Sequence, residues 1–278
     1  MTKYPTLFIP HGGGPCFFMK PGDGFPSGAW DGMGDYLKGL SSTVAKPGAI
    51  VIVSGHWEEP QPALYAPAHT KLLFDYYGFP NYTYQLSYPA KSSAPVAAMV
   101  RQLLNGAGFD CGENQERGFD HGVFIPLMLV YPRADVPVVQ LSLEAGYDPR
   151  RHLEIGRALA PLREQGVLIL GSGMSYHNLR AFGVATENGA AADFDNWLVS
   201  AVTESDAAVR NQRLTDWRRA PSALRAHPQA EHLAPLFVAA GAALDDPGVV
   251  DYSGEVLGKK VSAFRFGGSS SDIIANHA

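Results

Sequence analysis

Three apolar runs in this sequence each stop at glycine or proline and are followed by a histidine. Residues Val51–Trp57 read Val-Ile-Val-Ser-Gly-His-Trp, Thr6–Pro10 leads to His11, and Val167–Gly173 leads through a short loop to His177. Runs of this length and composition predict buried strands. Ligands of open α/β sheets bind beyond the carboxyl ends of strands, so we expect these histidines to share one site. A metal site or an acid/base site is the leading interpretation.

Helical and extended patterns alternate along the chain. Met33, Leu37 and Leu40, for example, recur at helical spacing. Helices are predicted at 29–44, 93–104, 123–131, 149–163, 193–209 and 222–243, the last interrupted at His227-Pro228, and strands at 6–10, 48–54, 136–143, 167–171, 249–252 and 261–266, with shorter extended pieces at 63–65 and 71–74. This alternation predicts an α/β fold, and we expect one domain over residues 1–278 that ends in a tail at 267–278.

Two loops are rich in aromatic side chains. Residues 15–27 carry Phe17, Phe18 and Phe25, and an ordered loop of this length is either functional or packed by its own aromatics. Residues 75–89 contain five tyrosines and two prolines, and the prolines prevent a regular helix. Such a segment either packs against an edge of the sheet or lines a pocket for a flat ligand.

Composition and charge exclude several classes of partner. The net charge of -5 gives no electrostatic footprint for nucleic acid or for an anionic membrane. No apolar run approaches the roughly 18 residues of a membrane span, and the two cysteines cannot form a disulfide framework. We therefore expect a cytoplasmic protein that acts on a small molecule. The sequence leaves the number of subunits open.

The nine histidines divide by their surroundings. Six lie near glycine, proline or a strand end and are candidates for function: His11, His56, His121, His177, His227 and His232. Three lie in other contexts and are expected to be solvated: His69, His152 and His277. Neutral imidazole is the commonest ligand of first-row metals, and three protein ligands with open positions suit catalysis by Fe(II) or Zn(II).

Local motifs exclude some alternatives and leave one choice open. The sequence has no His-Glu-x-x-His, no cysteine cluster, no P-loop lysine and no Gly-x-Ser-x-Gly elbow. Glu231 and His232 are expected on a helix, where consecutive residues point about 100° apart, so one metal would take only one of them. A triad of two histidines and one carboxylate would choose Glu231. Upstream, Asp120 is expected to cap the helix that follows it.

A set of short motifs, taken together and in order, resembles one enzyme family. The motifs are Ser54-Gly-His-Trp57, Tyr76-Tyr-Gly-Phe-Pro80, Arg117-Gly-Phe-Asp-His-Gly122, Gly171-Ser-Gly173 with His177-Asn178, and His227-Pro with Glu231-His232. They span nearly the whole chain and resemble the DOPA-dioxygenase group of class III (LigB-type) extradiol ring-cleavage dioxygenases. One departure is His11-Gly-Gly-Gly-Pro15, where the group more often has His-Gly-Ser-Pro, and the aromatic loop after it is longer.

The resemblance implies a fold, a reaction and a set of site residues. The fold would be a single α/β domain with a central mixed sheet flanked by helices. The reaction would insert O2 into a catechol-type ring, of DOPA or another substituted catechol, at non-haem Fe(II) to give a ring-opened semialdehyde, and Zn(II) would also fit the site. The metal ligands would be His11, His56 and His232. The catalytic acid/base would be His177, and the substrate site would include His121, His227, Tyr76 and Tyr77, with Phe79 and Tyr82 as further walls.

An imidazole changes its protonation state near neutral pH, so His177 would accept a phenolic proton of the catechol and return it later. Two other classes compete with this interpretation. A zinc-dependent hydrolase would use the same three histidines, but the sequence offers no clear carboxylate base for it. A binding protein without enzymatic activity would use the same scaffold, because a fold does not fix a function. Consumption of O2 with a catechol separates the dioxygenase from both.

Overall fold

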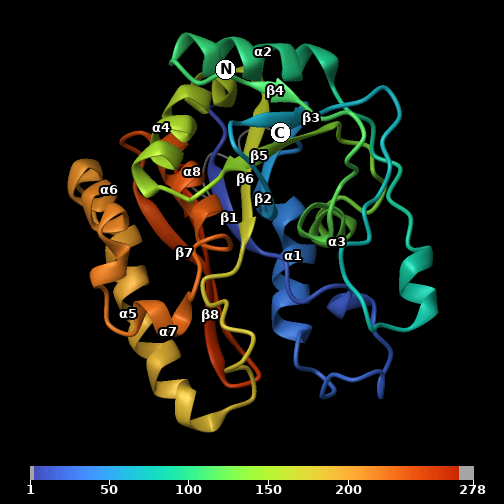
Figure 1. Ribbon diagram of the computed structural model, residues 1–278, viewed down its shortest axis with the longest axis vertical. Coiled ribbons are helices and arrows are strands. Elements are labelled where there is room, and N and C mark those ends of the chain that lie inside the picture. The colour runs from blue at the N-terminus through green and yellow to red at the C-terminus, as the bar shows by residue number, and fades with distance from the viewer. Residues whose placement is uncertain (1–2, 269–278) are drawn as a thin grey trace.

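The computed structural model describes residues 3–268, and within them one eight-stranded sheet runs through the molecule (Figure 1). Its strands are β1 (Thr6–Pro10), β2 (Ala49–Glu59), β3 (Ala63–Tyr65), β4 (Gly112–Glu113), β5 (Val138–Glu144), β6 (Val167–Gly173), β7 (Gly248–Val256) and β8 (Lys259–Phe266). Their order across the sheet is β4-β3-β5-β2-β6-β1-β8-β7. Strands β5, β2, β6 and β1 are parallel, whereas β3 and β8 pair antiparallel with them. The predicted α/β fold with a mixed sheet is confirmed.

Side chains that alternate along the central strands enter two hydrophobic cores. In β2, Ile50 and Ile52 belong to one core and Val51 and Val53 to the other. Helices α1 (Asp31–Thr43) and α3 (His121–Val130) pack in the first core, and α2 (Ala94–Gly106), α4 (Pro149–Leu159), α5 (Asn188–Val202) and α8 (Ala234–Ala243) in the second (Figure 1). Because both faces of the parallel strands are covered, their sequences read as continuous apolar runs.

The helix predicted as continuous at 193–209 is divided, and the interruption predicted at His227-Pro228 in the helix at 222–243 is longer than expected. The helix predicted at 193–209 breaks before Asp206, whose carboxylate accepts hydrogen bonds from the backbone N–H groups of Ala208 and Val209 and begins α6 (Ala207–Thr215). The helix predicted at 222–243 is present only at its ends, as α7 (Ala223–Ala226) and α8. His227 precedes proline and has an extended backbone, φ -131° and ψ 92°, which ends α7. Residues 227–233 therefore form an irregular segment.

The prediction that His152 is solvated is wrong. Its side chain is completely buried, its Nδ1–H donates to the carbonyl oxygen of Asp148 at 2.8 Å, and its Nε2 accepts from the backbone N–H of Glu144 at 3.2 Å. The ring thus joins the end of β5 to the first turn of α4, and burial lowers its pKa. His69 is exposed, as predicted, whereas His277 lies outside the described residues.

Smaller differences concern the edges of the fold. The extended piece predicted at 71–74 makes one isolated bridge, between Leu72 and Phe119, instead of a strand. Of the predicted tail, residues 269–278 lie outside the described residues. Among residues 3–268, no helix combines the length and the apolar character that crossing a membrane requires.

Candidate metal centre and active site

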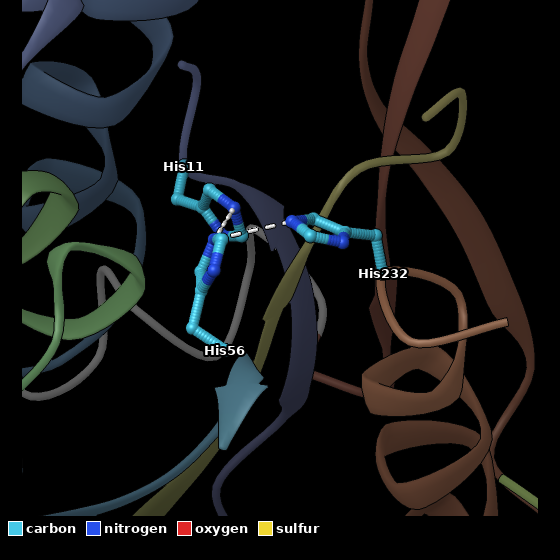
Figure 2. Close-up of side chains that lie close together, drawn as sticks. All are labelled: His11, His56 and His232. Atoms are coloured by element: carbon cyan, nitrogen blue, oxygen red, sulfur yellow. Dashed lines mark hydrogen bonds between the residues drawn. The ribbon is translucent and has the colours of Figure 1, made fainter. Parts of the chain in front are cut away.

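Three histidines from distant parts of the chain converge at the carboxyl edge of the parallel strands (Figure 2). The Nε2 atom of His56 lies 3.1 Å from Nε2 of His11 and 3.1 Å from Nε2 of His232. His11 directly follows β1, His56 lies in the last half of β2, and His232 lies in the irregular segment before α8. His11 is fully buried and His232 almost so, whereas His56 is partly exposed. The predicted convergence of His11 and His56 is thus observed.

Hydrogen bonds on the outer side of two rings fix their tautomers. Nδ1 of His11 lies 3.0 Å from the hydroxyl oxygen of Ser172, which donates its own hydrogen to the carbonyl oxygen of Gly122 and must therefore accept one from His11. Nδ1 of His232 donates to Oε1 of Glu231 at 3.1 Å. With the hydrogen on Nδ1, each ring presents a lone pair on Nε2 toward His56. Outer partners of this kind are typical of histidines that bind metals.

The spacing and charge state of this cluster fit one metal ion. Nitrogen ligands that share an ion at about 2.1 Å lie roughly 3.0–3.4 Å apart for bond angles between about 90° and 110°, and 3.1 Å falls in this interval. Burial, followed by repulsion between the rings, lowers the pKa of His11 and His232, and burial also lowers that of His56. The imidazoles are therefore neutral at neutral pH and can bind a cation without first losing a proton.

Glycines allow the backbone to bring these histidines together. A Cβ atom on Gly55 would lie 3.2 Å from Cα of His232, and one on Gly173 would lie 2.1 Å from the carbonyl oxygen of His232. Strand β2 also shifts register against β5 between Val53 and Glu58, which lifts the intervening residues out of the ladder. Gly171-Ser-Gly173, which is not a nucleophile elbow, thus serves as the surface on which the His232 segment packs.

Glu231 and His232 both belong to the site. The ring of His232 is part of the histidine cluster, whereas the carboxylate of Glu231 lies behind that ring. Because the segment is not helical, the two side chains do not diverge as expected. Oε1 of Glu231 accepts from Nδ1 of His177 at 2.8 Å as well as from His232. Burial raises the pKa of Glu231, but its hydrogen bonds with His177 and with its own backbone outweigh this and leave the pKa below its ordinary value. The ionised carboxylate of Glu231 thereby links the ring of His232, which belongs to the cluster, to the neighbouring ring of His177.

His177 and His121 lie next to the cluster, and each is held by a carboxylate. The ring of His177 stacks on that of His232, with centroids 3.3 Å apart and an interplanar angle of 17°. Nδ1 of His121 lies 2.8 Å from Oδ1 of Asp75, which also accepts from the backbone N–H of His121. The other oxygen of Asp75 lies 3.6 Å from Nδ1 of His56. Asp75 and Glu231 therefore occupy equivalent outer positions on two sides of the cluster.

A cavity of about 470 Å³ opens onto these rings. His56, His121, His177 and His232 line it. Both predicted tyrosines also line it: Tyr76 is buried and donates to the carbonyl oxygen of Thr83 at 2.7 Å, whereas Tyr77 is 92% exposed at the rim. The segment at 75–89 thus lines a pocket, and Phe79 belongs to the same wall.

The aromatic loop after β1 supplies another part of the wall. Phe25 and Trp30 line the cavity and pack edge to face, with ring centroids 5.4 Å apart. Gly12 and Gly14 have positive φ angles, and a Cβ atom on either would meet Cys16 or Phe79 within 3 Å. The Gly-Gly-Gly run therefore turns the chain tightly enough to bring this loop back over the site.

Two predicted substrate residues do not line the cavity. His227 is fully buried, its Nε2–H donates to the carbonyl oxygen of Ser175 at 2.9 Å, and its ring packs 5.2 Å from that of Phe194. Burial lowers its pKa to about 4, so the ring is neutral and anchors the irregular segment from inside the core. Tyr82, proposed as a further wall, instead accepts from the backbone N–H of Lys20 at 3.0 Å and lies outside the cavity.

Asp120, predicted as a helix cap, makes no capping hydrogen bond with its side chain. Its buried carboxylate accepts from Ser54 Oγ at 2.7 Å, from Gln140 Nε2 at 2.5 Å and from Arg117 at 2.9 Å. Arg117 also donates to the carbonyl oxygen of His56 at 2.8 Å. This network ties the bulged end of β2 to the start of α3. Ser54, Arg117 and Asp120 belong to two of the motifs in the sequence, but local spacing gave no sign that they meet.

Nearly the whole chain matches one protein family. The model described as the catalytic LigB subunit of aromatic ring-opening dioxygenase matches residues 5–270. The chain belongs to the LigB family.

Individual LigB relatives agree with this assignment. The chain is 35% identical to dioxygenase tasH of Hapsidospora irregularis over 97% of this chain and 87% of that protein. It is 42% identical to the 4,5-DOPA dioxygenase extradiol of Beta vulgaris over 71% and 74% of the two chains. The crystal structure of an uncharacterized protein from Escherichia coli K12 matches with a TM-score of 0.76 and 27% identity, covering 95% of this chain and all of the other.

As a LigB protein, the chain is an extradiol ring-cleavage dioxygenase, an enzyme that requires a metal, an aromatic substrate and O2. The three converging histidines offer a metal-binding group, and two of them, His56 and His232, line the cavity. Two further groups, His56 with Asp75 and His121, and His177 with Glu231 and His232, are also close enough to hold an ion. In both of these the carboxylate is already hydrogen-bonded to a histidine Nδ1, so the Nε2 cluster offers the better set of free lone pairs.

We expect Glu231→Ala in this LigB protein to reduce metal affinity or turnover by about 10–100-fold, the usual effect of removing an outer partner of a metal-binding histidine. The loss arises because the rings of His177 and His232 both lose the acceptor that orients them. Glu231→Gln keeps one amide oxygen as acceptor, so its loss should be smaller. Titration with Fe(II) and steady-state kinetics would measure both effects. Wild-type metal affinity and turnover in the alanine variant would contradict this role.

Proposed function

We propose that this enzyme uses Fe(II) to cleave a substituted catechol beside its two hydroxyl groups, with O2 as the second substrate and a ring-opened semialdehyde as the product. We assign the metal to His11, His56 and His232 and the acid/base role to His177. The observation that carries the proposal is the convergence of Nε2 atoms, with two lone pairs fixed by outer hydrogen bonds, at an aromatic-walled cavity. Relatives named 4,5-DOPA dioxygenase extradiol support a catechol as the substrate class.

A metal ion held by His11, His56 and His232 would supply a positive charge that favours the ionised form of a phenol, and a site for O2 beside the ring. Three neutral nitrogen ligands leave coordination positions for other groups, which is the arrangement of catalytic sites rather than of structural ones. The protein contributes orientation, because the rings are held by Ser172 and Glu231 before any ligand binds.

His177 is suited to move a proton between substrate and product. It lines the cavity, and its Nδ1–H is committed to Glu231, which leaves Nε2 as the nitrogen that takes up and releases a proton. The carboxylate stabilises the imidazolium that forms when the ring accepts a phenolic proton. His121, held by Asp75 at another position in the cavity wall, is assigned to contact with the substrate.

The aromatic walls are suited to hold a flat ring. Tyr76 and Phe79 pack edge to face, with centroids 5.4 Å apart, and the hydroxyl group of Tyr76 is committed to Thr83. Tyr76 therefore presents a fixed apolar surface rather than a free hydroxyl group. We infer that residues 1–278 act as a single catalytic domain, since both cores pack on one sheet and the family match extends over residues 5–270.

Reconstitution with two metals tests the proposal. After removal of bound metal by a chelator, anaerobic addition of Fe(II) should restore O2 consumption with 4-methylcatechol and a yellow product, whereas Zn(II) should not, because zinc has no redox chemistry. Metal analysis of both samples checks that each ion is bound. Equal turnover with Zn(II), or hydrolysis of an ester in place of O2 consumption, would favour a zinc hydrolase. Binding of a catechol without turnover under any metal would favour a binding protein.

A further inference from the structure

The cavity wall beyond the histidines is uncharged. Among the described residues, none that lines the cavity is lysine, arginine, aspartate or glutamate. The carboxylates of Asp75 and Glu231 stand behind the wall and are already hydrogen-bonded to His121 and His177. The guanidinium group of Arg117 is also committed, to Asp120 and to the carbonyl oxygen of His56. A charged substituent on the substrate would thus meet no counter-ion among the side chains that line the cavity.

The apolar side chains that pack together in this wall come from three segments that are distant in the sequence. Trp30 belongs to the loop after β1, Met174 and Phe182 to the loop after β6, and Leu257 to the turn between β7 and β8. Trp30 and Met174 belong to one hydrophobic cluster, against which Phe182 and Leu257 pack. This side of the cavity is therefore a continuation of a hydrophobic core.

The rim of the same cavity carries exposed apolar side chains. Tyr77 and Leu179 both line it, and their exposed fractions, 92% and 72%, are the largest among the exposed large hydrophobic residues that the structure describes. Exposed apolar groups beside a cavity favour a ligand that covers them. A volume of about 470 Å³ is within the range of pockets that bury drug-sized ligands and exceeds what an unsubstituted catechol ring requires.

We propose that this site selects catechols whose ring carries an uncharged, apolar substituent, such as an alkyl or aryl group, that extends along the wall formed by Trp30, Met174, Phe182 and Leu257 toward Leu179. The inference rests on the proposed function, because the diol must be held at the histidine cluster for the substituent to extend away from it. It distinguishes this enzyme from one adapted to an amino-acid side chain, whose carboxylate or ammonium group would lose its hydration without gaining a partner.

A substrate series tests this selectivity with the Fe(II)-loaded full chain. We expect kcat/KM to rise by roughly two- to fourfold per methylene from 4-methylcatechol to 4-butylcatechol, as expected for burial of CH2 groups. At equal length, 3,4-dihydroxyphenylpropionate, dopamine and DOPA should be poorer substrates by about tenfold or more, since an unpaired charge loses its hydration. A charged catechol that equals or exceeds the neutral one of the same length would overturn the inference.

Anaerobic binding of the same compounds, followed by calorimetry, separates this inference from the proposed function. Tighter binding of the alkylcatechols without any cleavage in air would support the selectivity and refute the dioxygenase assignment. Cleavage or binding without preference for the neutral compounds would refute the selectivity alone. Absence of binding by every catechol would refute both.

Leu179→Arg provides a matched test of the wall, because the side chain is exposed and its replacement should not disturb folding. The new cation should raise kcat/KM for 3,4-dihydroxyphenylpropionate by up to about fivefold, the range of an exposed ion pair, and lower it for 4-butylcatechol. Leu224→Arg adds the same charge at another exposed leucine, which does not line the cavity, and should change neither value. Equal shifts in both variants would show that net charge, rather than the wall, sets the preference.

Discussion

Replacement of His177 by asparagine is expected to lower kcat by about 10²–10⁴-fold, the usual contribution of a positioned acid/base, while the metal content stays at the wild-type level. Asparagine keeps a donor for Oε1 of Glu231, so the orientation of His232 is preserved. What the variant lacks is a nitrogen that can take up a proton and release it again. The loss should therefore appear in kcat more than in KM.

Metal analysis and steady-state kinetics on the same preparation measure both parts of this prediction. His177→Ala is the companion variant, and it should be at least as slow because it also removes the hydrogen bond to Glu231. Wild-type turnover in His177→Asn would remove the residue from the mechanism. Loss of metal together with activity would instead make His177 part of the metal site.

Replacement of His56 by alanine is expected to abolish both metal binding and ring cleavage. His56 is the central member of the cluster, since its Nε2 lies 3.1 Å from the Nε2 atoms of both His11 and His232. Its removal leaves two of the three proposed ligands, and the loss in activity should exceed about 100-fold, the upper end of what loss of an outer partner costs. His69→Ala is the control, because that histidine is exposed and lies outside the cluster.

The effect on folding should be small for His56→Ala, because the ring is partly exposed and faces the cavity. Circular dichroism and thermal unfolding of the metal-free proteins check this, so that loss of metal is not confused with loss of structure. Full Fe(II) occupancy in folded His56→Ala would show that another set of side chains holds the ion.

The sequence predicted the positions of those histidines that follow the ends of parallel strands. Because β1, β2 and β6 are parallel neighbours, their carboxyl ends meet at one edge, so His11, His56 and His177 were expected together without a structure. Their spacing could not show which nitrogen of each ring faces inward. That depends on Ser172 and Glu231, which reach the rings through tertiary contacts.

The directions of the side chains in the irregular segment at 227–233 could not be predicted from the sequence. Glu231 and His232 were expected on a helix that resumes after the interruption at His227-Pro228, so the choice between them rested on the family resemblance. His227 shares the same sequence context but points into the core, and no local pattern distinguishes the two directions. Asp75 was missed as well, because an aspartate at the start of a tyrosine-rich loop gives no sign of the histidines it will meet.

Labelled dioxygen gives the most direct test of the reaction proposed for this site. The Fe(II)-loaded enzyme would turn over 4-butylcatechol under ¹⁸O2, with the aldehyde reduced by borohydride as it forms so that its oxygen does not exchange with water. Mass spectrometry of the ring-opened product should find both atoms of O2 in it, with one O2 consumed per catechol. An ortho-quinone without labelled oxygen, or a product with only one labelled atom, would contradict ring cleavage by a dioxygenase at the histidine cluster.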